Sequence, residues 1–293
     1  MILVKSETIQ EYVEKGWWSE QTIGDLFLHW ADRRSSELAV LDPPNQFEIC
    51  GYPPQQWTWH ELLGQVGRYA ALLSSQGLRK DDILVMQLPN SVEQHAIYLA
   101  CAITGIVVSP IPVQYRIHEI SHVMEITQAK LAITTQHVGN FKAAQTWAEH
   151  AHLFPSLKSI WSLGQELPTG VQSLTTLLSQ TKAWDTSQIK DHMKVTNVSA
   201  HDVLTICWTS GTEAKSKGVP RNHNEWLIVG SSVSQAGELE EGAHLLIPFP
   251  FVNMAGVSTS LATWLLIGGT LHHHHPFDLQ LFVEQLRAFP MDY

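Results

Sequence analysis

The sequence predicts an α/β protein made of doubly wound, mostly parallel sheets flanked by helices. Three observations predict it. Short apolar runs alternate along the chain with stretches whose apolar residues recur at helical spacing. Strands that alternate with helices pair in parallel through right-handed crossovers. Finally, the 293 residues are 44% hydrophobic and include 11 Trp, so the chain can fill a large core.

The first half of the chain contains most of the predicted alternation. Up to residue 54 we expect a strap of short elements, with a helix at 21–33 and a loop at 43–54. Ser91 is a candidate N-cap, because its hydroxyl can accept a hydrogen bond from a free backbone N–H. The elements expected after the strap are helices at 59–76, 91–103, 117–128 and 139–150 and strands at 83–88, 106–109 and 131–135.

The stretch 163–199 is polar and poorly periodic, which indicates a surface excursion and a boundary between subdomains. We therefore expect a first α/β subdomain at 1–195, which includes the strap, and a second, incomplete one at 196–293. The elements expected in the second subdomain are strands at 202–208, 244–248 and 270–274 and helices at 222–235, 258–266 and 278–288.

Composition excludes several classes of function. There are 28 acidic and 18 basic residues, giving a formal charge of −10 without a basic cluster, which argues against nucleic acid as a partner. The most apolar stretch, 96–113, is interrupted by Gly and Pro, so no membrane span is expected. The three cysteines are scattered, which excludes a disulfide framework, and no signal peptide precedes them; we expect a cytoplasmic protein.

The segment from Thr209 to Gly218 has the composition of a phosphate-binding loop. It leaves a buried strand and contains several hydroxyl side chains, two Gly and two Lys. Glycine lets backbone N–H groups approach a ligand closely, hydroxyls donate to phosphate oxygens, and lysine offsets phosphate charge. The Walker pattern fails, because the second Gly comes too late and the Lys precedes it, and the dinucleotide pattern G-x-G-x-x-G is absent from the loop.

This segment resembles the signature T-S-G-T-T-G-x-P-K-G of the AMP-dependent synthetase and ligase superfamily. It departs from the signature at Glu213, Ala214 and Ser216. Further segments resemble motifs of the same superfamily in the same order. The motifs are W-T-x-x-E-L at 57–62, Q-L-P-N-x-x-E at 87–93, R-x-x-E-I at 116–120, the histidine His223, P-L-F-H-x-x-G at 250–256 and G-G-T at 268–270. The Gly-Trp-Trp at 16–18 and the Gln-Leu-Pro-Asn at 87–90 resemble the branch of the superfamily that activates aryl or alicyclic acids.

The resemblance implies that a carboxylic acid is activated by ATP to an acyl-adenylate and then transferred to a thiol. Expected cofactors are ATP, Mg²⁺ and, as acyl acceptor, coenzyme A or a carrier pantetheine. It implies no resident metal-binding cluster. The nucleotide-binding residues it implies are Thr209, Ser210, Gly211, Thr212, Glu213, Lys217 and Gly218, and the substrate-binding residues are His223, Asn253, Met254 and Gly256. In aryl-acid relatives an asparagine near this place contacts a ring hydroxyl, so we hypothesise that Asn253 contacts the acid.

Other residues implied by the resemblance have no match in this sequence. They are the G-x-T-E segment, an aspartate for ribose and the catalytic lysine of a small C-terminal domain, all expected beyond residue 293. We therefore expect negligible adenylation by this chain alone, and a complementary C-terminal chain as a partner. The alternative function is a non-catalytic fragment that binds a nucleotide or a partner.

Two histidine patterns suggest metal. His118, Glu119 and His122 match H-E-x-x-H, which on a helix can hold zinc for a metallopeptidase, although a third ligand is not evident. The run 272–275 is four consecutive His. In a strand these side chains point to both faces and cannot converge on one ion, so we expect a solvent-exposed strand end there. Cys207, in an apolar strand, is expected in the core.

Overall fold

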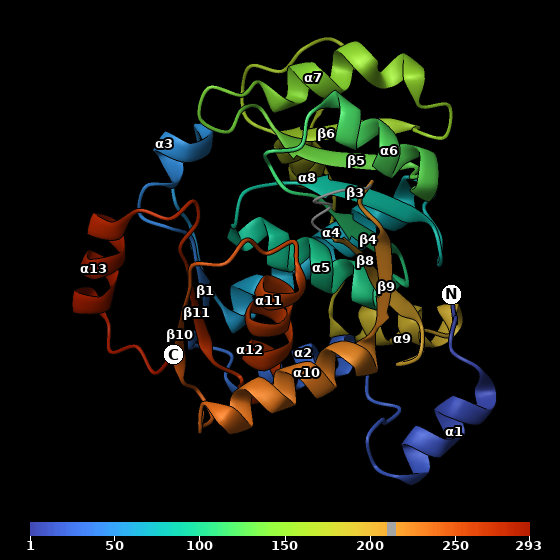
Figure 1. The fold of residues 1–293 in the computed structure, drawn as a ribbon, viewed down its shortest axis with the longest axis vertical. Coiled ribbons are helices and arrows are strands. Elements are labelled where there is room, and N and C mark those ends of the chain that lie inside the picture. Colours follow the sequence, from blue (N-terminus) through green and yellow to red (C-terminus); the bar gives the residue numbers. More distant parts are fainter. Residues whose placement is uncertain (210–214) are drawn as a thin grey trace.

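The computed structural model describes residues 1–209 and 215–293 and contains two β-sheets flanked by helices (Figure 1). The predicted α/β class, with mostly parallel sheets, is confirmed. Many of the predicted elements lie within a few residues of the observed ones. The strand predicted at 131–135 is observed as Leu131–Thr135, because its apolar run is buried along its whole length.

The larger sheet has seven strands in the order β7-β6-β5-β3-β4-β8-β9. All neighbours are parallel except β8 and β9, which form an antiparallel pair with Trp208 opposite Gly218. The predicted loop connects these two strands, so it leads into a strand before the next helix. The strands are β3 (Ile83–Gln87), β4 (Val107–Pro110), β5 (Leu131–Thr135), β6 (Ser159–Leu163), β7 (Gln172–Ser173), β8 (Val203–Trp208) and β9 (Gly218–Asn222).

The smaller sheet has four strands in the order β10-β11-β1-β2, of which only β1 and β2 pair antiparallel. Its strands are β1 (Leu38–Leu41), β2 (Gln56–Thr58), β10 (His244–Ile247) and β11 (Thr270–His273). Each sheet thus takes strands from both sides of residue 195. The proposed division into 1–195 and 196–293 therefore does not coincide with a division between sheets.

Helices α4 and α5 lie between the two sheets, while α13 covers the outer face of the smaller sheet (Figure 1). Every residue of α5 is buried, which explains the apolar stretch without a membrane. The helices are α1 (Ser6–Glu14), α2 (Ile23–Arg33), α3 (Gln46–Cys50), α4 (Trp59–Ser75), α5 (Val92–Thr104), α6 (Ile117–Thr127), α7 (Ala143–His150), α8 (Leu174–Gln180), α9 (Thr186–Thr196), α10 (His223–Ala236), α11 (Met254–Val257), α12 (Trp264–Ile267) and α13 (Leu279–Ala288), with a 3₁₀ turn η1 (Ala151–Leu153) and a π-helical segment η2 (Ser258–Thr263).

Three local predictions are corrected. The expected loop at 43–54 contains α3, which is too short to produce a helical period in the sequence. The expected surface excursion at 163–199 contains β7, α8 and α9; Ser173 and Asp185 cap the two helices, and β7 extends the larger sheet. The helix expected at 258–266 begins earlier, at α11, and passes through the π-helical segment.

Two side-chain expectations also change. The four consecutive histidines are buried, not solvent-exposed: their exposed fractions lie between 0% and 9%. Ser91 does occupy the N-cap position of α5, but its side chain makes no capping hydrogen bond. Instead, Asp42 Oδ1 accepts from the backbone N–H of Val92, at 2.8 Å.

Candidate functional site

The two ends of the predicted phosphate loop, Thr209 and Lys217, are hydrogen-bonded to each other and form what we call the loop stem. At its base the N–H of Thr209 donates to the carbonyl of Lys217, and the N–H of Lys217 donates to Thr209 Oγ1, both at 3.0 Å. Both side chains are exposed. The backbones of Thr209 and Lys217 are therefore held together beyond the carboxyl end of β8. Ser210, Gly211, Thr212 and Glu213 lie outside the described residues.

The stem occupies a favourable place in the sheet. Strands β4 and β8 are neighbours, but the chain leaves β4 toward β5 on one side and leaves β8 toward β9 on the other. Ligands of open α/β sheets bind at the carboxyl ends of strands where the direction of the connections reverses in this way. Gly218 keeps the stem narrow, since a Cβ there would lie 2.9 Å from Ile206 Cγ2.

Helix α6 contacts the returning limb of the loop. His122 Nε2 donates to the carbonyl of Ser216 at 2.8 Å, and the His122 ring lies edge-on to Trp208 with centroids 5.9 Å apart. Trp208 in turn donates from Nε1 to Ser109 Oγ at 2.9 Å. Sequence reasoning noticed His122 only as a metal ligand. The contact with the loop joins residues 94 positions apart, so no local pattern could indicate it.

The segment predicted to line the acid pocket is held by α5 and by the residues before it. Asn90 donates from Nδ2 to the Phe249 carbonyl and accepts from the N–H of Phe251 at Oδ1, both at 2.8 Å. Tyr98 donates its hydroxyl to the Phe251 carbonyl at 2.9 Å. The motif Q-L-P-N contained Asn90, but its role as a clamp on a distant loop was not predicted.

Asn253 begins α11 as its N-cap, with Oδ1 accepting from the N–H of Gly256 at 3.0 Å. Met254 beside it is exposed, whereas Gly256 is buried. A Cβ at Gly256 would lie 1.9 Å from the Pro250 carbonyl oxygen, so only glycine fits the turn. The amide nitrogen of Asn253 forms no hydrogen bond within the part of the chain that the structure describes, which leaves it able to donate to a ligand.

His223 lies away from solvent, with 1% of its surface exposed. It is the first residue of α10, and its Nδ1 accepts from the N–H of Ile23 at 3.1 Å, at the start of α2. Burial lowers the pKa of His223 to about 4, so the ring is neutral at pH 7. Its contacts among the described residues thus stabilise a helix start, and its role in substrate binding stays a prediction.

The H-E-x-x-H residues are not arranged as a metal site. His118 is exposed, and Glu119 accepts from the N–H of Arg116 at 3.0 Å, which lowers the pKa of its carboxyl group. His122 faces the loop. Across 1–209 and 215–293, no group of three or more His, Cys, Asp or Glu side chains could hold a metal ion. Cys207 is in the core as predicted, and burial raises its pKa to about 11.

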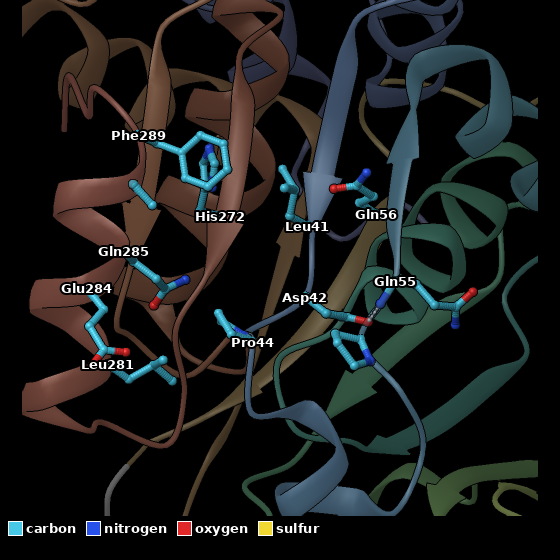
Figure 2. A pocket seen from close by; sticks show the side chains of 12 residues that line it. Leu41, Asp42, Pro44, Gln55, Gln56, His272, Leu281, Glu284, Gln285 and Phe289 are labelled. Carbon is cyan, nitrogen blue, oxygen red and sulfur yellow. Dashed lines mark hydrogen bonds between the residues drawn. The ribbon is translucent and has the colours of Figure 1, made fainter.

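A cavity of about 370 Å³ lies between α13 and the strands β1 and β2 (Figure 2). Glu284 and Gln285 line it on the helix side, and Asp42 and Gln55 line it on the strand side. Asp42 Oδ2 accepts from the N–H of Gln55 at 2.9 Å. None of the predicted nucleotide or acid residues that the structure describes lines this cavity, so it is separate from the loop.

The sequence matches the family described as AMP-binding enzyme over residues 27–290. The chain therefore belongs to the AMP-binding, adenylate-forming family. It is 26% identical over 228 residues to a mitochondrial medium-chain acyl-CoA ligase of Rattus norvegicus, a match that covers 72% of this chain and 37% of the relative. It is 21% identical over 244 residues to a salicylyl-CoA synthase / salicylate adenylyltransferase of a Streptomyces species, covering 83% and 42%.

Solved structures show the same fold. The N-terminal domain of FACL13 from Mycobacterium tuberculosis superposes with a TM-score of 0.67 at 22% identity, covering 90% of this chain and 61% of that one. The chain thus corresponds to the N-terminal portion of its relatives and spans well under half the length of the curated ones. In the described residues, none of the helices has the length and apolar character needed to cross a bilayer.

Proposed function

We propose that this chain takes part in the ATP-dependent activation of a carboxylic acid to an acyl-adenylate, followed by transfer of the acyl group to a thiol such as coenzyme A or carrier pantetheine. The observation that carries the proposal is the pair of hydrogen bonds between Thr209 and Lys217. They join the backbone of Lys217 to the Thr209 hydroxyl, and a hydroxyl next to a lysine supports phosphate binding because the phosphates of ATP need donors and charge compensation. Membership of the AMP-binding family supports the same reaction.

The described residues of the loop suit ATP, whereas they offer no protein ligand for Mg²⁺. The exposed Lys217 and the Thr209 hydroxyl suit the β- and γ-phosphates of ATP. Magnesium keeps several waters and binds largely through substrate phosphates, so it needs no cluster of protein carboxylates. The described residues form no such cluster, and we assign none of them to Mg²⁺. We expect the protein to work in the cytoplasm, since its three cysteines are free and buried.

Loss of the Lys217 charge tests the phosphate role. We expect Lys217→Ala to weaken ATP and pyrophosphate binding by about tenfold, as for the loss of one charge-assisted contact. Lys215→Ala is a matched control, because Lys215 is an exposed lysine on the same limb and its loss changes the charge equally. Isothermal titration of the 293-residue protein measures both. Equal losses of affinity in the two variants would mean that only the net charge of the loop matters, and would contradict a specific role for Lys217.

Activity needs its own measurement. Pyrophosphate release with a panel of aliphatic and aromatic acids, for this chain alone and with a complementary C-terminal chain, reports acyl-adenylate formation. ATP binding without pyrophosphate release in either case would favour the second candidate, a non-catalytic fragment that binds a nucleotide or partner.

For the acid itself we propose an aryl or alicyclic carboxylic acid that accepts a hydrogen bond from Asn253 Nδ2. The free amide nitrogen of Asn253 and the exposed Met254 next to it support this proposal. Asn253→Ser keeps an N-cap for α11 but removes the amide donor. We expect it to change the order of preference among hydroxylated and unsubstituted aromatic acids, and an unchanged order would contradict the assignment.

A further inference from the structure

A second cavity, of about 600 Å³, opens beyond the carboxyl end of β6. Its wall is formed by the segment around α3, by residues that follow β6, by the start of α8 and by Glu93 of α5. Strands β5, β3 and β4 separate β6 from β8. At about 4.8 Å per strand, the cavity lies roughly 19 Å along the sheet edge from the phosphate loop. It is therefore a separate place on the same ligand-binding edge.

Glu93 is the charged side chain in the wall of this cavity, and only 4% of its surface is exposed. Gln55 Nε2 donates to Glu93 Oε1 at 2.6 Å. The other oxygen, Oε2, is buried and has no hydrogen-bond partner among the residues that the structure describes. Burial raises the pKa of Glu93, and the neighbouring Ser91 hydroxyl does not reach hydrogen-bond geometry with its carboxyl group. A buried carboxylate oxygen in this state is unfavourable, because it has lost water without gaining a donor.

A second buried acidic group, Asp42, lies beside Glu93. Both oxygens of Asp42 are occupied, by the N–H groups of Val92 and Gln55. Burial and the charge of Glu93 raise the pKa of Asp42 well above its usual range. Within the described ranges, neither carboxylate forms an ion pair with a Lys, Arg or His side chain. A positive charge next to Glu93 Oε2 would therefore reduce the repulsion between the two acidic groups.

One further buried acceptor in this region, the side-chain oxygen of Gln46, also lacks a donor. Gln46 is fully buried and donates its amide N–H to Tyr52 Oη at 2.9 Å, but its Oε1 has no partner in the described part of the chain. Tyr52 itself lines the cavity, as does Gln55. An ammonium group carries three donors and no acceptor, so it fits a site in which acceptors are in excess. Divalent cations usually require more than one available carboxylate oxygen.

We propose that this cavity binds a small molecule through a protonated amine, seated on Glu93 Oε2 with the ring of Tyr52 and the exposed Thr175 and Thr176 around it. The amine brings a positive charge, which no Lys, Arg or His side chain of the described residues supplies to Glu93 or Asp42. The aromatic ring of Tyr52 adds a surface that attracts cations. This binding is independent of the proposed acid–thiol ligase activity, because the two sites are separated by three strands.

Methylammonium chloride is the probe, compared with potassium chloride at the same ionic strength. We expect saturable binding by isothermal titration and a rise in Tm with methylammonium, and at least a tenfold smaller response to potassium. Glu93→Gln should abolish the methylammonium response while folding normally, since the amide is isosteric and removes a like charge beside Asp42. Glu48→Gln, an exposed glutamate on α3, is the matched control and should bind as the wild type does.

Thr175→Trp provides a second variant that keeps Glu93 and fills the cavity from its exposed wall. It should also lose methylammonium binding, with ATP binding unchanged. An absent response in the wild type, an equal response to potassium, or full binding in both Glu93→Gln and Thr175→Trp would each overturn the proposal.

Discussion

At the scale of single residues, the two histidines of the H-E-x-x-H pattern have different environments on the same helix. His118 is exposed, whereas His122 is partly buried, contacts Trp208 and donates to the Ser216 carbonyl. Nε2 carries a proton because it faces a carbonyl oxygen, whereas the other ring nitrogen, Nδ1, is buried without a partner among the described residues. The structure thus gives His122 the role of a link between α6 and the predicted phosphate loop.

His122→Ala should therefore destabilise the loop stem and His118→Ala should not. Removing the hydrogen bond to Ser216 is expected to lower the free energy of unfolding by about 1–2 kcal/mol, and to speed amide hydrogen exchange at Lys217 and Gly218. Truncation of exposed His118 should change stability by less than about 0.5 kcal/mol. Urea unfolding and hydrogen exchange measure both. A zinc site would need both histidines, so equal effects that disappear with a chelator would refute the link.

At the scale of elements, the region 163–199 is part of the packed structure. The linker before α9 crosses α4 at Gly67, where the N–H of Trp184 donates to the Gly67 carbonyl at 3.1 Å. Ile189 of α9 is fully buried, and Met193 comes close to Gly24 of α2. Helix α9 therefore covers α4 and α5 from the side, although its sequence is largely polar.

Two glycines of α4 test this packing. A Cβ at Gly67 would lie 2.2 Å from the Trp184 carbonyl oxygen, whereas a Cβ at Gly64 would meet nothing within 4 Å. Gly67→Ala should lower the free energy of unfolding by more than about 2 kcal/mol, because backbone must move. Gly64→Ala should raise it by about 0.5–1 kcal/mol through helix propensity. Thermal and urea unfolding compare the two; a neutral Gly67→Ala would mean that the linker does not pack on α4.

An element could be predicted from the sequence when the interactions that form it are local in the chain. Strand β5 and helix α4 follow from local apolar spacing, and the capping box at Thr58 and Glu61 fixes where α4 begins. Strand β1 pairs with β11, more than 200 positions away, so its four residues carry no local signal of a second sheet. A loop after β8 was predicted from composition, while its return into β9 and the contacts of Asn90 and His122 were not, because all are contacts between residues far apart in sequence.

At the scale of the whole molecule, α5 joins the two sheets partly through buried histidines. His273 of β11 donates from Nε2 to His95 Nδ1 at 3.1 Å, and His95 Nε2 donates to the Ser260 carbonyl at 2.9 Å. Both rings are fully buried, and Phe251 packs on His95 with centroids 4.7 Å apart. A histidine is polar, but the rings of His95 and His273 fill core volume because each has a hydrogen-bond partner on another element.

Burial makes these histidines a source of acid sensitivity. It lowers the pKa of His95, His223, His272 and His275 to about 4, and it also lowers the pKa of His273 well below its usual value. The unfolded chain binds protons at pKa about 6.5, so between about pH 6.5 and 4 it holds more protons than the folded chain. The free energy of unfolding should therefore fall as the pH falls through this window, by about 1.4 kcal/mol per pH unit for each neutral histidine. Asp42 and Glu93, whose pKa values are raised, act in the opposite sense and reduce the slope, because the folded chain retains their protons longer as pH rises.

Replacement of the pair by apolar side chains, His95→Phe with His273→Leu, should remove two of these contributions. Urea unfolding at a series of pH values between 4.5 and 6.5 should then give a slope smaller by about 1.4 kcal/mol per pH unit for each histidine replaced. Phe251→Leu is the matched control: it trims a fully buried side chain against the same rings but does not titrate. It should lower the free energy of unfolding at every pH and leave the slope unchanged. If the double variant kept the wild-type slope, the pair would already be protonated in the folded protein, and the neutral core between α5 and β11 would be wrong.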